Sequence, residues 1–304
     1  MSKENPTLQE KLDLAIGKEE GLKGGFKTKK GVFYNNYLTN SEWEIFKANM
    51  DEHHRKQYGA GGGGELEEKN GSHGWMPPKM ASFGSSSRFI YKLSKDIPGF
   101  IFEEQLDTRV GGIANLDGFL SQGKKNIYVE AKRREIYTSH DKEEIKMVYE
   151  NVYDSIPDEL VRYDIIEKDI HKKEGSSPVM KGIFYLGGRP VPYFDLKQLI
   201  CHFLGITYDL AKSKTDVEEV QFLYLVYNPT RLEEKLYDTA AFKTIQKGYK
   251  ETTFADDRRK MEYVIEKVFY AVLDYQISRN KLIKPEVKFS FKIVDQDEYL
   301  KYFE

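Results

Sequence analysis

A chain of 304 residues is long enough for one large domain or two smaller ones, and its 32% of charged residues indicate a heavily solvated surface. The net charge of −2 excludes a globally basic nucleic-acid-binding surface, so a DNA-binding face would have to be local. The single cysteine, Cys201, excludes an intrachain disulfide, and the lack of an apolar leader or of any apolar run of about 18 residues predicts a cytoplasmic chain without secretory signal or membrane span.

Residues 1–76 are predicted to form an N-terminal helical region with a glycine-rich loop. Thr7–Ile16 has the N-cap and apolar spacing of a short amphipathic helix, and Asn40–Tyr58 begins with a capping pattern typical of a second one. The segment Gly59–Gly64 is glycine apart from one alanine. It is either a hinge or a loop whose backbone can approach substrate phosphates, and the sequence leaves both interpretations open.

Residues 77–304 are predicted to form the main domain, which begins with the pattern of one helix and three strands. A serine N-cap marks the start of the helix, and β-branched and aromatic residues mark the strands. The helix and the three strands are expected at Ser85–Leu93, Gly99–Thr108, Asn115–Leu120 and Ile127–Lys132. The polar segment Ser121–Asn126 between the last two strands predicts a hairpin loop.

The predicted hairpin carries the one group of residues whose arrangement indicates catalysis. Folding it symmetrically about its loop brings Asp117 opposite Glu130, and Lys132 then lies on the same face as Glu130. Two facing carboxylates repel each other by roughly 0.2–1 kcal/mol, and by more when they are desolvated. Lys132 offsets part of this repulsion, and a divalent cation such as Mg²⁺ would offset more. A metal beside an ammonium group suits phosphodiester hydrolysis.

The pattern Asp-x12-Glu-x-Lys on a strand–loop–strand frame resembles the PD-(D/E)XK nuclease superfamily, which has a restriction-endonuclease-like fold. The resemblance implies an α/β fold with the element order helix, strand, strand, strand, helix, strand. It also implies that Asp117, Glu130 and the backbone carbonyl of Ala131 hold Mg²⁺ or Mn²⁺, and that Lys132 is the catalytic lysine. This chain departs from the pattern at Leu116, which stands where the family motif has proline.

Many members of this superfamily add an upstream acidic residue, and Glu103 and Glu104 are the two choices here. They lie on opposite faces of the expected strand because strand side chains alternate. We favour Glu104, which shares its face with Phe102 and Phe100, but the sequence leaves the choice between the two glutamates open.

The remainder of the chain is predicted to complete the sheet and its covering helices. Residues 139–173 are interpreted as a mostly helical insertion. A near-continuous apolar run predicts a central strand at Glu219–Tyr227, and strict alternation predicts an edge strand at Val287–Val294. The other elements are expected as a strand at Val179–Leu186, a helix at Phe194–Leu204 that stops at Gly205, and a long helix at Thr253–Lys281.

Several further residues are assigned supporting roles. Gln198 is predicted to face the site from the helix after the hairpin, Glu135 lies at the exit of the last strand, and His202 is interpreted as a structural histidine. Basic residues near the hairpin are either contacts to the DNA backbone or an ordinary charged strand end, and they are Lys124, Lys125, Arg133 and Arg134.

These observations predict an α/β protein with a restriction-endonuclease-like core, a mixed central sheet flanked by helices, and helical additions. The predicted function is Mg²⁺-dependent hydrolysis of DNA phosphodiester bonds by a restriction-type endonuclease, with a homodimer as an open possibility. The alternative is a non-catalytic nucleic-acid-binding or assembly module that keeps the fold. A third interpretation is a scaffold protein without any nucleic-acid role. The alternative for the residues themselves is that Glu130 and Lys132 form an ordinary solvated pair.

Overall fold

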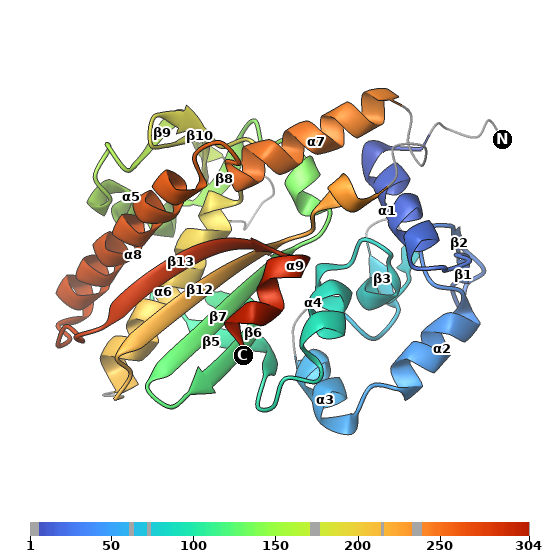
Figure 1. Cartoon of the computed structure of the whole chain (residues 1–304). Helices are drawn as coiled ribbons and strands as arrows, with labels where there is room; N and C mark the ends of the chain where they lie inside the picture. Colours follow the sequence, from blue (N-terminus) through green and yellow to red (C-terminus); the bar gives the residue numbers. More distant parts are fainter. Residues whose placement is uncertain are drawn as a thin grey trace.

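The computed structural model describes residues 6–60, 64–71, 74–170, 177–213, 216–232 and 239–303, which build one mixed central sheet with helices on both faces and a smaller second sheet (Figure 1). The α-helices of these residues are α1 (Leu8–Glu19), α2 (Asn40–Ala48), α3 (Glu52–Ala60), α4 (Ser86–Ser94), α5 (Glu150–Ser155), α6 (Leu196–Ser213), α7 (Thr239–Thr253), α8 (Arg258–Asn280) and α9 (Gln296–Tyr299). The strands are β1 (Phe26–Lys27), β2 (Phe33–Tyr34), β3 (Lys69–Gly71), β4 (Gly74–Met76), β5 (Ile101–Asp107), β6 (Ile113–Gln122), β7 (Lys125–Lys132), β8 (Glu143–Lys146), β9 (Val161–Ile170), β10 (Val179–Leu186), β11 (Arg189–Pro190), β12 (Glu219–Val226) and β13 (Lys288–Asp295). Short 3-10 turns are η1 (Lys79–Ala81), η2 (Glu135–Tyr137), η3 (Met147–Tyr149), η4 (Pro229–Arg231) and η6 (Leu300–Tyr302).

The central sheet has the strand order β13-β12-β7-β6-β5. Strands β13, β12 and β7 run parallel to one another, whereas β7, β6 and β5 are antiparallel neighbours. Helices α6 and α8 pack on one face, and α4 packs on the other, where Ile90 lies against Gly118. Parallel strands need cover on both faces because they are apolar on both. The prediction of an α/β fold with a mixed central sheet flanked by helices is confirmed.

The two strands with the clearest sequence patterns occupy the positions that those patterns predict. Strand β12 lies between β7 and β13, and the residues Val220–Val226 are buried. Strand β13 lies at the edge of the sheet and alternates between buried and partly exposed residues. Phe289, Phe291 and Ile293 share one buried face, and Val294 is buried on the other face near the end of the strand.

The hairpin of β6 and β7 is tighter than predicted. Gln122 pairs with Lys125, so the turn consists of Gly123 and Lys124 alone, and Gly123 has a φ of 62°, which favours glycine. The ladder runs from this turn to the pair Gly118↔Val129. One further step in the same register leads to Asp117 and Glu130, as the symmetric hairpin required.

The chain order of the core is α4, β5, β6, β7, α6, β12, with additional elements between β7 and α6. Ser85 caps α4 as expected, because its side chain accepts a hydrogen bond from the Arg88 backbone N–H. The predicted stop of the next helix at Gly205 is wrong, since α6 continues to Ser213. A side chain at Gly205 would lie only 2.8 Å from Leu106 Cβ. The glycine therefore allows α6 to approach β5 and β6 closely.

The predicted helical insertion at residues 139–173 is wrong. The described part of this segment contains β8, β9 and only one short α-helix, α5. Strands β8 and β9 pair antiparallel with β10, which also pairs with β11, and the four form a second sheet. The charged residues of β9 resemble the solvated face of a helix, but they alternate with buried or half-buried residues along much of the strand.

The N-terminal region contributes to the same hydrophobic core as the sheet. The predicted helix Asn40–Tyr58 is divided into α2 and α3, because Asp51 between them accepts a hydrogen bond of 2.8 Å from the His54 backbone N–H and starts a new helix. Residues 61–63 of the glycine-rich loop lie outside the described residues.

Two arginines that follow β7 bind acidic residues of the N-terminal region. Arg134 Nη1 lies 2.9 Å from Asp13 Oδ2, and Asp13 is completely buried in α1. The buried Arg133 pairs with Glu20, the residue that ends α1. Its guanidinium also lies 5.3 Å from the ring centres of both Phe89 and Tyr227. These contacts attach α1 to the exit of β7.

We expect Arg134→Ala to lower the free energy of unfolding by about 3 kcal/mol at pH 8, because a buried carboxylate would lose its ionic partner. Burial already raises the pKa of Asp13, and Arg134 opposes this rise. Without Arg134 the Asp13 carboxyl of the folded protein would hold its proton more tightly, so the loss of unfolding free energy should become smaller as the pH falls toward 5. Urea unfolding at pH 8 and at pH 5 measures this loss. Lys284→Ala, which removes an exposed pair with Asp274, is the control, and equal effects of the two variants would contradict the prediction.

Candidate active site

Asp117, Glu130 and Lys132 converge at the C-terminal end of β7. The ladder between β6 and β7 stops at Gly118↔Val129, and beyond it the Asp117 carboxylate takes the place of a backbone partner. The Ala131 N–H donates a hydrogen bond of 2.7 Å to Asp117 Oδ2. This contact fixes the carboxylate beside β7, next to Glu130.

The Asp117 carboxylate lies in an excess of negative charge. Burial raises its pKa well above the usual range, and the neighbouring carboxylates of Glu130 and Glu103 raise it further. The Ala131 N–H and Lys132 act in the opposite direction but do not compensate. Any cation that enters this site would therefore be stabilised by Asp117.

Glu130 is buried and has a cationic or polar group at each oxygen. Lys132 Nζ lies 2.9 Å from Oε1, and His202 Nε2 of α6 lies 2.9 Å from Oε2. Burial alone would raise the pKa of Glu130, but the contacts with Lys132 and His202 outweigh this effect and lower the pKa to about 2. Glu130 therefore carries a negative charge at neutral pH.

Lys132 is buried as well, and α6 provides its remaining contacts. Its ammonium group donates a hydrogen bond to Gln198 Oε1 and lies 3.9 Å from Asp195 Oδ2, just before α6. Burial opposes the charged form of Lys132, but the carboxylate of Glu130 outweighs this effect and raises the pKa well above the usual range. The structure thus brings together Asp117, Glu130, Lys132 and Gln198, which were predicted as site residues.

Glu103, rather than the favoured Glu104, faces this cluster. Burial raises the pKa of Glu103 to about 7, and the carboxylates of Glu65 and Glu130 contribute to the rise. The acidic neighbour of Glu104 is Asp209 of α6. The preference for Glu104 assumed regular alternation, but Glu103 has a φ of 57°, which interrupts the alternation of β5.

The basic residues predicted to contact DNA do not gather at the site. Lys124 and Lys125 lie at the hairpin turn, where they pair with Glu218 and Glu219. The turn is at the far end of β7, about 23 Å from Lys132 at the usual rise per residue. Arg133 and Arg134 are held by the ion pairs with α1 described above. The four residues therefore do not form one basic surface at the site, and their contact with the DNA backbone stays a prediction.

Glu135 and His202 have roles that the sequence did not reveal. The Glu135 carboxylate accepts hydrogen bonds of 3.1 Å from the backbone N–H groups of Arg133 and Arg134, and so shapes the turn that follows β7. His202, interpreted as structural, lies against Glu130 and directs the carboxylate. Gln198 was predicted to face the site, and His202 lies four residues later on the same helix face, which was the signal that could have identified it as a second neighbour.

The residues at this site fit a divalent cation that keeps part of its water shell. Within the described ranges no group of three or more His, Cys, Asp or Glu side chains is arranged to hold a metal ion. Mg²⁺ commonly binds through one or two carboxylates and several waters. Asp117 and Glu130 supply two carboxylates, and the repulsion that raises the pKa of Asp117 is what such an ion would relieve.

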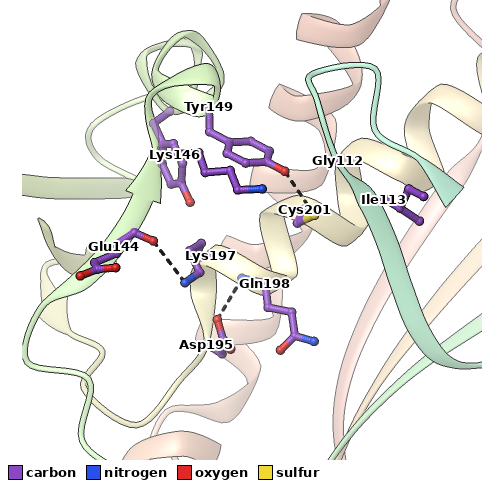
Figure 2. A pocket seen from close by; sticks show the side chains of 10 residues that line it. Gly112, Ile113, Glu144, Lys146, Tyr149, Asp195, Lys197, Gln198 and Cys201 are labelled. Carbon is purple, nitrogen blue, oxygen red and sulfur yellow. Dashed lines mark hydrogen bonds between the residues drawn. The ribbon is translucent and has the colours of Figure 1, made fainter. Parts of the chain in front are cut away.

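A cavity of about 430 Å³ adjoins the site (Figure 2). Asp195 and Gln198, which both approach Lys132, line one side, and Cys201 follows on the next turn of α6. Lys146 and Tyr149 line the opposite side, on β8 and η3. Figure 2 shows their side chains projecting toward α6. The cavity gives access to the neighbours of Lys132.

No family model, curated protein or solved structure matches the chain. The description of the site therefore depends on the geometry of this structure alone. In the described segments no helix is both long enough and apolar enough to cross a membrane.

The contact between Glu130 and Lys132 predicts strong energetic coupling. Lys132→Met would leave a carboxylate buried beside His202 alone, so we expect it to lower the free energy of unfolding by about 3–5 kcal/mol. The double variant Glu130→Gln/Lys132→Met should lose less than the sum of the two single losses, by about 1–3 kcal/mol. Urea unfolding of the four proteins gives this coupling energy. Losses that add within about 0.5 kcal/mol would show that the two groups do not stabilise each other.

Proposed function

We propose that the protein is a metal-dependent nuclease with a restriction-endonuclease-like core that hydrolyses DNA phosphodiester bonds. The observation that supports this most is the meeting of Asp117, Glu130 and Lys132 where the β6–β7 ladder ends. The chain order of α4, β5, β6, β7, α6 and β12 agrees with the order that the superfamily resemblance implies.

Each residue of the site has a distinct chemical task in this proposal. Asp117 and Glu130, with the Ala131 carbonyl, would hold Mg²⁺ or Mn²⁺, which when bound acts as a Lewis acid on the phosphate and lowers the pKa of water. Lys132 stays protonated because the acidic neighbours raise its pKa. Its role is therefore to stabilise negative charge on the reacting phosphate rather than to accept a proton.

The residues of α6 position the lysine. Gln198 accepts a hydrogen bond from Lys132, and His202 holds the second oxygen of Glu130. These contacts leave Lys132 a limited range of positions, as electrostatic preorganisation requires.

A non-catalytic nucleic-acid-binding or assembly module is the second candidate. It is favoured by the burial of Glu130 and Lys132, whose side chains are 4% and 8% exposed, and by their mutual neutralisation without a metal. The two candidates differ in one measurable property, which is the appearance of nicked plasmid when Mg²⁺ or Mn²⁺ is present.

The purified protein should convert supercoiled plasmid to nicked or linear DNA with Mg²⁺ or Mn²⁺ and not with EDTA. We expect Asp117→Asn to reduce this rate by roughly 100-fold or more. The variant should be at least as stable as the wild type, because asparagine removes the repulsion from Glu130 and Glu103 and can still accept from Ala131. Asp96→Asn, an exposed aspartate away from the hairpin, is the control. Wild-type cleavage by a folded Asp117→Asn protein would refute the assignment.

The two glutamates of β5 provide an independent comparison. Glu103→Gln is expected to slow nicking by about 10- to 100-fold because it removes a carboxylate from the field of Asp117 and Glu130. Glu104→Gln should leave the rate within about twofold, since its acidic neighbour is Asp209. Single-turnover nicking at saturating Mg²⁺ measures both rates. The reverse order would mean that Glu104 joins the site.

A further inference from the structure

The cavity beside Lys132 has the dimensions and lining of a ligand site. Its volume of about 430 Å³ lies within the range of roughly 300–1,000 Å³ that is common for small-ligand pockets. The β5–β6 turn, the segment from β8 to η3, and the start of α6 form its walls (Figure 2). The ligand would therefore lie between the central sheet and the sheet formed by β8 to β11.

The walls combine an aromatic ring, an apolar surface and a few polar groups. The half-buried Tyr149 ring is held with its hydroxyl 3.8 Å from Cys201 Sγ, and a side chain at Gly112 would lie 2.6 Å from that hydroxyl. Ile113 adds an exposed apolar surface at 58% of its full area. A flat, partly apolar ligand can pack on these side chains.

The charged and amide groups of the cavity are two lysines, the Gln198 amide and the carboxylates of Glu144 and Asp195, and Lys146 is the cation that can meet an anion attached to a ring. Among the described residues Lys146 has no carboxylate at ion-pair distance, and Figure 2 shows its ammonium group directed toward α6 between Tyr149 and Gln198. Gln198 accepts from Lys132 through its oxygen, which leaves the amide N–H groups as donors. Lys197 is not assigned to the ligand, because its ammonium group already donates a hydrogen bond of 3.3 Å to the backbone carbonyl of Glu144.

We propose that this cavity binds one unpaired nucleobase of the DNA, next to the phosphate that reaches Lys132. The proposal rests on the nuclease function above, because Gln198 and Asp195 belong to both the cavity and the surroundings of Lys132. Tyr149 provides the stacking surface, the Gln198 amide meets the base edge, and Lys146 contacts the adjoining phosphate. A base that is paired inside a duplex cannot enter such a cavity. The substrate class is therefore single-stranded DNA or DNA with an extrahelical nucleotide.

The test measures binding separately from cleavage. The Asp117→Asn protein is titrated, with Mg²⁺ and with EDTA, into a fluorescein-labelled 12-nucleotide single strand, its blunt duplex, and the same duplex with one bulged nucleotide. We expect the single strand and the bulged duplex to bind at least about tenfold more tightly than the blunt duplex. Equal affinity for all three probes would overturn the proposal.

Three further substitutions in the same background locate the binding site. Tyr149→Leu keeps the apolar volume but removes the ring, and should weaken single-strand binding by roughly 5- to 100-fold with little change for the duplex. Lys146→Ala should make the dependence of the logarithm of the binding constant on the logarithm of the salt concentration less steep by about 0.7, which is the value for one contact to a single-stranded phosphate. The exposed Lys142→Ala, on the same segment, is the matched control and should bind as the parent does.

The outcomes separate the base site from the nuclease function. If Tyr149→Leu and Lys146→Ala bind the single strand as tightly as Lys142→Ala, the cavity is not the base site, whatever the nicking assay shows. If both variants lose affinity for the single strand while the wild type cuts no DNA with either metal, the base site stands and hydrolysis is refuted.

Discussion

The buried contact between Glu130 and Lys132 is the interaction on which the geometry of the site depends. Two charges removed from water lose several kcal/mol of hydration each, and their attraction compensates only when the remaining hydrogen-bonding groups are also satisfied. Here α6 places His202 Nε2 2.9 Å from Glu130 Oε2 and supplies Gln198 as the hydrogen-bond acceptor for Lys132. The position of α6 is therefore coupled to the charges on β7. Gly205 allows this close approach at the point where α6 crosses β5 and β6.

The same end of β7 also determines how the N-terminal region is attached. Lys132 turns inward to Glu130, while the next two residues, Arg133 and Arg134, pair with acids of the N-terminal segment. Three consecutive cations are thus compensated by three carboxylates, one from β7 and two from the N-terminal segment. This arrangement explains why the arginines after β7 stabilise the fold instead of forming an exposed basic surface.

The central sheet and the hairpin of β6 and β7 were predictable because their signals are local. Apolar runs and strict alternation identify β12 and β13, and the polar turn between two apolar strands determines the register that brings Asp117 to Glu130. The choice of Glu103 was not predictable, because it depends on a positive φ within an apparently regular strand. The partners of Arg133 and Arg134 lie more than 100 residues earlier in the chain, and no local pattern connects them.

The second sheet was missed because charged residues suit an exposed strand and a solvated helix equally well.

The charges around Lys132 restrict how an anionic substrate could approach. Asp117, Glu103 and Glu130 influence one another, and Asp195 lies on the cavity side of the lysine. One lysine cannot neutralise this number of carboxylates, so the site without a divalent cation repels phosphate. The pKa values of Asp117 and Glu103 are raised for the same reason, since protonation is the other way to reduce the excess charge. An acidic pocket beside a buried ammonium group is thus suited to an anionic substrate only when a cation accompanies it. The metal that we propose for this site would therefore also balance the charge of the fold.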